Sequence, residues 1–191
     1  MIERFQQNEL LLRKKVLKLF GGAFHIYDTE GNLLFYSKQK AFKLKEDIRL
    51  YTDESMNEEI IRIQARAVID WSAAYDVIDV VNDQKVGALR RKGWKSILRD
   101  HWQILDADDN QVGEIVEDSQ LMALLRRFLS SLIPQNFDVI IAGKKQCDFA
   151  QRFNPFVYKL NIIYQPDANA FERIMSLCAA VLLAAIEGRQ G

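Results

Sequence analysis

One segment near the C-terminal end constrains the fold more than any other part of the chain. Residues Ile174–Ile186 read IMSLCAAVLLAAI, and only Ser176 among them is clearly polar. A surface helix keeps one polar face, so a helix without one must be enclosed on all sides. The segment is longer than a usual strand and is rich in Ala and Leu rather than β-branched residues. It therefore predicts a buried helix.

Signals at both ends of the segment predict a helix over Ala170–Glu187. Asn169 and Glu172 have the N-cap to N3 spacing of a capping box. Gly188 fits the position just after the last turn, and Arg189 supplies a cation near the negative end of the helix dipole. Local sequence is therefore sufficient to predict where this helix begins and ends.

A bilayer or the interior of a protein could surround such a helix. A membrane span needs about 20 apolar residues, whereas a run of about 10–14 is more often a core helix. Arg173 and Glu187 bracket too short a run, which favours the protein interior. Ser176, Ala180 and Ala184 form a stripe of small residues that would let neighbouring strands approach the helix.

Composition fits one domain, residues 1–191, with 49% hydrophobic residues to fill a core. The formal net charge is zero, so there is no bulk electrostatic argument for a nucleic-acid partner. Cys147 and Cys178 do not make a disulfide framework. The apolar run Leu10–Leu12 is too short for a signal peptide. We therefore expect a cytoplasmic protein, with contact at a membrane surface left open.

The remaining sequence is mostly strand-like. Three times an apolar segment ends in Asp, passes through polar residues and returns as an apolar segment, at Asp28, Asp79 and Asp106. This pattern is typical of antiparallel hairpins rather than βαβ units. We expect about ten to twelve strands from fourteen strand-like segments, and a turn at Gly143–Lys145. The segments are Val16–Phe20, Phe24–Asp28, Leu33–Tyr36, Phe42–Leu44, Ile48–Tyr51, Glu58–Gln64, Val68–Ser72, Tyr75–Val81, Val86–Gly87, Gln103–Asp106, Val112–Gly113, Phe137–Ala142, Asp148–Phe153 and Val157–Tyr164.

One amphipathic helix is predicted among the strands. Ser119 can cap it, Pro134 ends it, and apolar residues recur at helical spacing from Leu121 to Leu132. The predicted fold is therefore mainly β: a closed antiparallel barrel around the apolar C-terminal helix, with the amphipathic helix outside. Closure also removes the strand edges that would otherwise aggregate.

Several segments in this order resemble the tubby C-terminal-like superfamily, and within it the LURP-one-related and phospholipid-scramblase-like proteins. They are Phe24–Asp28 with Gly31-Asn32, Gly87–Gly93, Ile104–Asp106 with Val112-Gly113, and Phe153–Phe156 before the final helix. The resemblance covers residues 9–187 and implies about twelve strands closed around that helix. Tubby-like members bind phosphoinositides through basic surface residues, and scramblase-like members are linked to calcium-dependent lipid movement. No lipid-binding position of tubby can be matched residue by residue here.

The densest group of cations follows the predicted strand at Val86–Gly87, and we take it as the candidate anion- or lipid-binding site. Its members are Arg90, Arg91, Lys92, Lys95 and Arg99. Trp94 lies within it and could sit at a membrane interface, while Asp100 adjoins it. The alternative, a solvated strand end in a protein of zero net charge, is the favoured interpretation.

Two further motifs have competing explanations. Asp106, Asp108, Asn110 and Glu117 match positions 1, 3, 5 and 12 of a calcium loop, but Gln111 stands where that loop needs Gly. An Asp-rich hairpin turn explains the same residues. The sequence from Gly93 to Ser96 is similar to the end of a phosphate-binding loop, but the glycine spacing and the intervening Trp rule that out.

The remaining polar residues do not form a recognisable catalytic set. His25 and His101 have no metal-ligand spacing, and both are more often structural. Asp70, Asp76 and Asp79, with Trp71 and Tyr75, could line a site but are better explained as strand-end and turn residues. We therefore expect no enzyme activity, cofactor or metal.

Three functions are compatible with the sequence. The first is a non-enzymatic binding module of the tubby-like class for an anionic lipid headgroup or another anion. The second is a protein-interaction or structural domain without a small ligand. The third, less favoured, is a membrane-inserted, scramblase-like lipid transporter.

Overall fold

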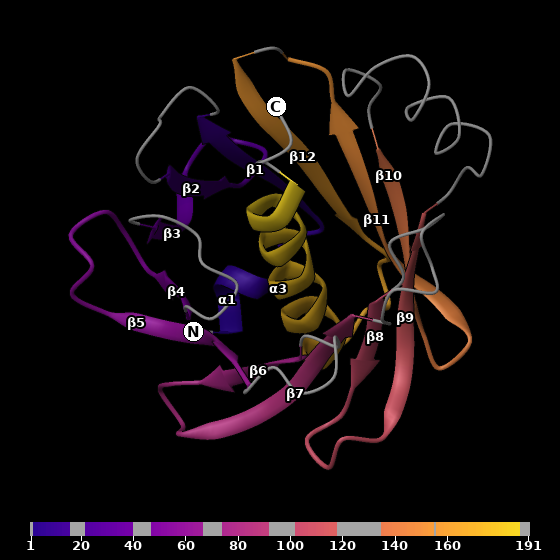
Figure 1. The fold of residues 1–191 in the computed structure, drawn as a ribbon. Helices are drawn as coiled ribbons and strands as arrows, with labels where there is room; N and C mark the ends of the chain where they lie inside the picture. Colours follow the sequence, from indigo (N-terminus) through magenta and orange to yellow (C-terminus); the bar gives the residue numbers. More distant parts are fainter. Residues whose placement is uncertain are drawn as a thin grey trace.

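The computed structural model describes residues 2–15, 22–39, 47–66, 74–91, 102–117, 135–154 and 156–187. Within these ranges, twelve antiparallel strands form one closed barrel, and helix α3 (Ala170–Glu187) follows the last strand. Figure 1 shows α3 running through the ring of strands. A mainly β fold with a closed antiparallel barrel and a C-terminal helix, as predicted from the sequence, is confirmed.

The strands follow one another around the barrel in sequence order, and β1 pairs with β12 to close it. Short helix α1 (Ile2–Phe5), which the sequence patterns did not predict, precedes the first strand. The strands are β1 (Glu9–Lys15), β2 (Gly22–Tyr27), β3 (Leu33–Gln39), β4 (Ile48–Tyr51), β5 (Glu59–Ala65), β6 (Ala74–Asp79), β7 (Gln84–Arg91), β8 (Trp102–Leu105), β9 (Gln111–Glu117), β10 (Asn136–Ile141), β11 (Lys144–Arg152) and β12 (Val157–Tyr164).

Alternating burial along the strands explains why these segments form the barrel wall. In β10, Phe137, Val139 and Ile141 are at most 4% exposed, whereas the residues between them are partly exposed. Successive side chains of a strand point to opposite faces, so this spacing places every second residue in the interior. The interior of the barrel is therefore the hydrophobic core, and polar side chains collect outside.

Five described hairpin turns lie at the same end of the barrel. They join β2 to β3, β4 to β5, β6 to β7, β8 to β9 and β10 to β11. The β10–β11 turn consists of Ala142 and Gly143, both with positive φ (51° and 76°). Two such residues match the twist of adjacent antiparallel strands. The turn predicted at Gly143–Lys145 was therefore placed too late, because Lys144 already pairs with Ile141 in the sheet.

Helix α3 has the bounds that the sequence predicts, and the capping box is present. Asn169 Oδ1 accepts a hydrogen bond from the Glu172 amide at 3.0 Å, and Glu172 Oε2 accepts one from the Asn169 amide at 2.7 Å. The side chains from Met175 to Ala185 are at most 2% exposed. The small residues Ser176 and Ala180 are fully buried.

Arg173 joins the start of α3 to the N-terminal segment. Its guanidinium donates hydrogen bonds to the carbonyl oxygens of Ala168 (2.8 Å) and Gln7 (2.8 Å) and to Asn8 Oδ1 (2.9 Å). It also lies over the ring of Tyr164, 5.0 Å from its centroid. Arg173 is only 7% exposed, and a buried cation needs hydrogen-bond acceptors in place of water. These contacts supply them.

Several predicted elements lie outside the described residues. They are the strands at Val16–Phe20, Phe42–Leu44 and Val68–Ser72, the amphipathic helix from Ser119 to Leu132, and the end signals Gly188 and Arg189. The predicted strand Tyr75–Val81 ends at Asp79, because Val80 and Val81 belong to the turn before β7.

Candidate anion-binding surface

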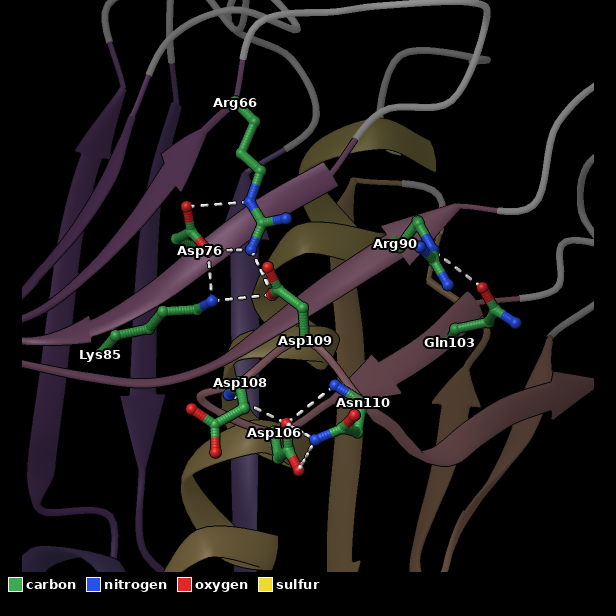
Figure 2. A network of polar contacts seen from close by, with 9 residues as sticks. All are labelled: Arg66, Asp76, Lys85, Arg90, Gln103, Asp106, Asp108, Asp109 and Asn110. Atoms are coloured by element: carbon green, nitrogen blue, oxygen red, sulfur yellow. Dashed lines mark hydrogen bonds and ion pairs between the residues drawn. The ribbon is translucent and has the colours of Figure 1, made fainter.

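Only two members of the predicted cationic cluster, Arg90 and Arg91, belong to the described residues. Both lie at the C-terminal end of β7, beside β8. Arg90 Nε donates a hydrogen bond to Gln103 Oε1 at 2.9 Å (Figure 2). Gln103 Nε2 in turn donates a hydrogen bond to Gln111 Oε1. The other three members, Lys92, Lys95 and Arg99, lie outside the described residues. The part of the cluster that the structure describes is thus a strand-end pair with one arginine held by an amide.

A second group of charges lies on the outer surface, across β5 to β7 and the β8–β9 turn, and neutralises itself. The Arg66 guanidinium contacts Asp76 at 2.5 and 3.0 Å and Asp109 at 2.6 Å. Lys85 Nζ lies 2.7 Å from Asp109 and 3.6 Å from Asp76 (Figure 2). Two cations and two carboxylates therefore alternate, and no positive charge is left over for an external anion.

The pKa shifts in this network follow from those contacts. Hydrogen bonds from Arg66 and Lys85 lower the pKa of Asp109 to about 2. Hydrogen bonds to Asp76 and Asp109 raise the pKa of Arg66. These contacts therefore favour the charged forms of Asp109 and Arg66.

The Asp-rich segment at Asp106 is a hairpin turn. Asp106 Oδ1 accepts hydrogen bonds from the amides of Asp108 and Asn110, both at 2.9 Å, and the Asn110 side chain binds Asp106 Oδ2 at 3.1 Å (Figure 2). These bonds lower the pKa of Asp106, the Asn110 side chain having the largest effect. Asp28 and Asn32 repeat the arrangement in the β2–β3 turn. The hairpin explanation, rather than a calcium loop, fits these contacts.

The other candidate polar residues are also paired within the described part of the chain. His25 Nε2 lies 2.9 Å from Glu54 Oε1, and its ring stacks on Tyr27. Asp79 accepts hydrogen bonds from the turn that follows it, and Tyr75 is fully buried beside β8. His101, Asp70 and Trp71 are outside the described ranges. Among the described residues, no group of three or more His, Cys, Asp or Glu side chains could hold a metal ion.

Three cations occupy adjacent outward positions on β1, β12 and β11, and we call them the basic row: Arg13, Lys159 and Arg152. The register places Lys159 between Arg13 and Arg152. Leu12 and Leu160, beside them along the strands, are fully buried, so strand alternation turns the basic row outward. No ion pair joins these cations to a carboxylate of the described residues; Arg13 lies over the ring of Tyr27, 5.7 Å from its centroid.

Two exposed aromatic side chains follow the basic row at the end of the β11–β12 hairpin. Phe153 is 55% exposed and Phe156 is 63% exposed. Asn154 Oδ1 accepts hydrogen bonds from the amides of Phe156 (3.0 Å) and Val157 (2.9 Å). The two aromatic residues therefore belong to a connection whose backbone is held by hydrogen bonds to the Asn154 side chain.

Sequence patterns missed the basic row, because its members come from strands far apart in the chain. Glu9 and Asn161, which are in contact across the same β1–β12 pair, are 152 residues apart. Only the register of the closed barrel brings Arg13 to Lys159. A usable signal was present in Phe153–Phe156, where two aromatic residues flank a polar Asn and a Pro.

A closed antiparallel barrel followed by a C-terminal helix is the architecture expected of the tubby-like barrels. The model of the LURP-one-related family matches residues 33–178, most of the chain, and the protein belongs to that family. Comparisons with curated proteins and with solved structures gave no match. In the described ranges, no helix is both long enough and apolar enough to cross a bilayer.

Proposed function

We propose that this LURP-one-related barrel is a non-enzymatic binding domain for anionic ligands, such as a lipid headgroup or another phosphate-bearing anion. The observation that supports this most directly is the basic row. Arg13, Lys159 and Arg152 lie side by side on the barrel surface, without a carboxylate partner among the described residues. An anion placed across them would supply the missing counter-charge.

The energetics of the basic row favour this interpretation. Like charges directly opposite each other across strands destabilise a sheet, on the same scale as the about 0.2–1 kcal/mol of favourable pairs. The row contains two such register pairs, Arg13–Lys159 and Lys159–Arg152. Near an anionic surface, each Lys or Arg instead contributes about 1 kcal/mol to binding. A bound anion would therefore convert an unfavourable arrangement into a favourable one.

The predicted cluster is retained in the proposal as a second contributor. Arg90 and Arg91 end β7 at the same end of the barrel at which β11 ends with Arg152. Lys92, Lys95 and Arg99 follow directly in the sequence. Cations from both sides of the barrel could then act on one extended anionic surface.

The non-enzymatic part of the proposal is supported by the state of the candidate reactive groups. Burial raises the pKa of the Cys147 and Cys178 thiols, which makes both poor nucleophiles at neutral pH. Asp76 and Asp109 form ion pairs, and Asp106 holds a turn. The carboxylates therefore have structural roles, and the thiols are unreactive at neutral pH.

Co-sedimentation with vesicles tests the proposal. The full chain is mixed with phosphatidylcholine vesicles containing none or about 30 mol% phosphatidylserine, at about 0.1 M and about 1 M salt, where charges are screened over about 10 Å and 3 Å. We expect binding only to the anionic vesicles, and only at low salt. Inositol hexakisphosphate should compete. The triple substitution Arg90→Ala, Arg91→Ala, Lys95→Ala measures the contribution of the predicted cluster.

Two results would contradict the proposal and identify an alternative. Absence of binding to every vesicle and to the soluble polyphosphate would favour a protein-interaction or structural domain. A requirement for detergent to extract the chain from membranes, with no effect of salt, would favour a membrane-inserted lipid transporter.

A further inference from the structure

The connection between β11 and β12 carries the most exposed aromatic side chains among the described residues. Phe153 and Phe156 each leave more than half of their surface in solvent. Arg152, the last residue of β11 and a member of the basic row, directly precedes Phe153. Asn154 braces the connection through two hydrogen bonds to its backbone. Apolar and cationic groups therefore adjoin at one connection, and two of its backbone amides are hydrogen-bonded to Asn154.

This connection lies at the end of the barrel where α3 ends. Lys14 pairs with Tyr158 in the sheet, and its ammonium reaches the Ala184 carbonyl near the C-terminal end of α3. Figure 1 shows the β11–β12 connection beyond that end of the helix. The opposite end carries the short turns, including Val81 in the β6–β7 turn and Lys144 at the start of β11. The aromatic residues and the basic row therefore lie near the same pole of the molecule.

We propose that this pole docks on the surface of an anionic bilayer, with Phe153 and Phe156 entering the interfacial layer while the basic row faces lipid phosphates. The inference rests on the proposed function and assigns it to a surface and a ligand class. Stable attachment to a bilayer usually needs two weak signals together. Here the phenylalanines supply the apolar signal and the basic row supplies the charge.

The size of the exposed apolar surface favours a bilayer over a protein partner. A phenylalanine buries about 150–250 Å², so Phe153 and Phe156 together present roughly 200–300 Å². A stable protein interface buries about 800 Å² on each partner. Two projecting side chains can enter a fluid interface without a preformed pocket, and the cations beside them complement anionic headgroups.

Paired substitutions test the docking surface on the full chain, with phosphatidylcholine vesicles that contain about 30 mol% phosphatidylserine. Arg152→Gln should weaken partitioning about fivefold at low salt, and Lys144→Gln, an equal charge change at the opposite pole, should not. The double variant Phe153→Ser, Phe156→Ser should weaken it at least tenfold, and Val81→Ser should leave it unchanged. All five sites are exposed, so the melting temperatures of the variants should match that of the parent chain.

A fluorescent label reports insertion independently of affinity. Cys147 and Cys178 are both buried, so a cysteine introduced at position 156 can be labelled selectively with an environment-sensitive dye. We expect a blue shift of the dye emission when anionic vesicles are added to the Phe156→Cys protein. The Val81→Cys protein, labelled in the same way, should show no shift.

The outcomes separate this inference from the proposed function. Anionic-vesicle binding that is unaffected by the Arg152 and phenylalanine substitutions would overturn the docking surface and leave the anion-binding function standing. Binding to inositol hexakisphosphate without any vesicle binding would assign the ligand to a free anion and overturn the bilayer. A blue shift at position 81 rather than 156 would place the membrane at the other pole.

Discussion

The ammonium of Lys14 lies 3.2 Å from the carbonyl oxygen of Ala184, a residue 170 positions further along the chain. Ala184 is in the last turn of α3, where helix carbonyls have no partner within the helix and the dipole is negative. Lys14 is only 9% exposed and also lies over the ring of Phe24, 5.1 Å from its centroid. A strand of the barrel wall therefore supplies the C-terminal cation of the enclosed helix.

Replacement of Lys14 by Met should lower the free energy of unfolding by about 1–2 kcal/mol, because a buried helix end loses its cation and a hydrogen bond. Urea denaturation measures the change. Arg13→Met is the matched control: Arg13 points outward in the basic row, so its loss should leave stability unchanged or slightly raise it. Equal destabilisation by both substitutions would contradict the assigned role of Lys14.

Replacement of Arg173 by Met should lower the free energy of unfolding by more, about 3 kcal/mol, because four acceptors around the guanidinium lose their donor in a buried site. Arg173→Lys should recover only part of this loss, since an ammonium cannot reproduce the planar fork. Denaturant unfolding gives the stabilities, and hydrogen exchange should show the amides near Asn8 exchanging faster in both variants. A fully stable Met variant would be inconsistent with this role.

Gly87→Ala should destabilise the barrel by about 1–3 kcal/mol. A Cβ atom at this position would lie 2.4 Å from the Leu105 carbonyl oxygen and 3.1 Å from the Met175 sulfur of α3. Gly22→Ala is the control, since its Cβ would meet only the flexible side chain of Lys14, at 3.3 Å. Thermal unfolding of the two variants measures the difference, and a Gly87 variant as stable as the Gly22 variant would show that β7 can move away.

Acidification should remove the contribution of Asp109 to stability. The unfolded carboxyl titrates near pH 4, whereas the folded pKa is about 2, so the contribution is complete above about pH 4 and is lost as the pH falls toward 2. Its size should stay near 1 kcal/mol or less, because the side chain is 45% exposed. Carboxyl NMR titration measures the pKa directly. Arg66→Met should raise it toward the usual value, and an unchanged low pKa would show that Arg66 is not the cause.

The helix at the centre of the fold could be predicted closely because its signals are local. The apolar run, the Asn169–Glu172 capping box and the length limit all lie within one stretch of sequence. Closure of the strands into a barrel followed from the need to enclose that run. The number twelve came from the family resemblance, because hydrophobic alternation alone does not fix how segments divide into strands.

The candidate site could be predicted only in part, because it depends on register. Arg90 and Arg91 were recognised as neighbours in sequence. Arg13 and Lys159 become neighbours only when β1 pairs with β12. The inward position of Lys14 could not be predicted for a related reason. A shift of the strand register by one residue would have turned this side chain toward solvent, and composition alone does not distinguish the two faces of a strand.

The order of strands around the barrel also implies an order of folding events. Among the described strands, each pairs with its sequence neighbour, and the β1–β12 seam alone joins distant segments. Hairpins can therefore assemble progressively as the chain leaves the ribosome, whereas the seam must wait for β12. Closing a loop of that length costs about 4 kcal/mol of chain entropy plus a constant. We expect seam closure and enclosure of α3 to be late, coupled steps that limit the folding rate.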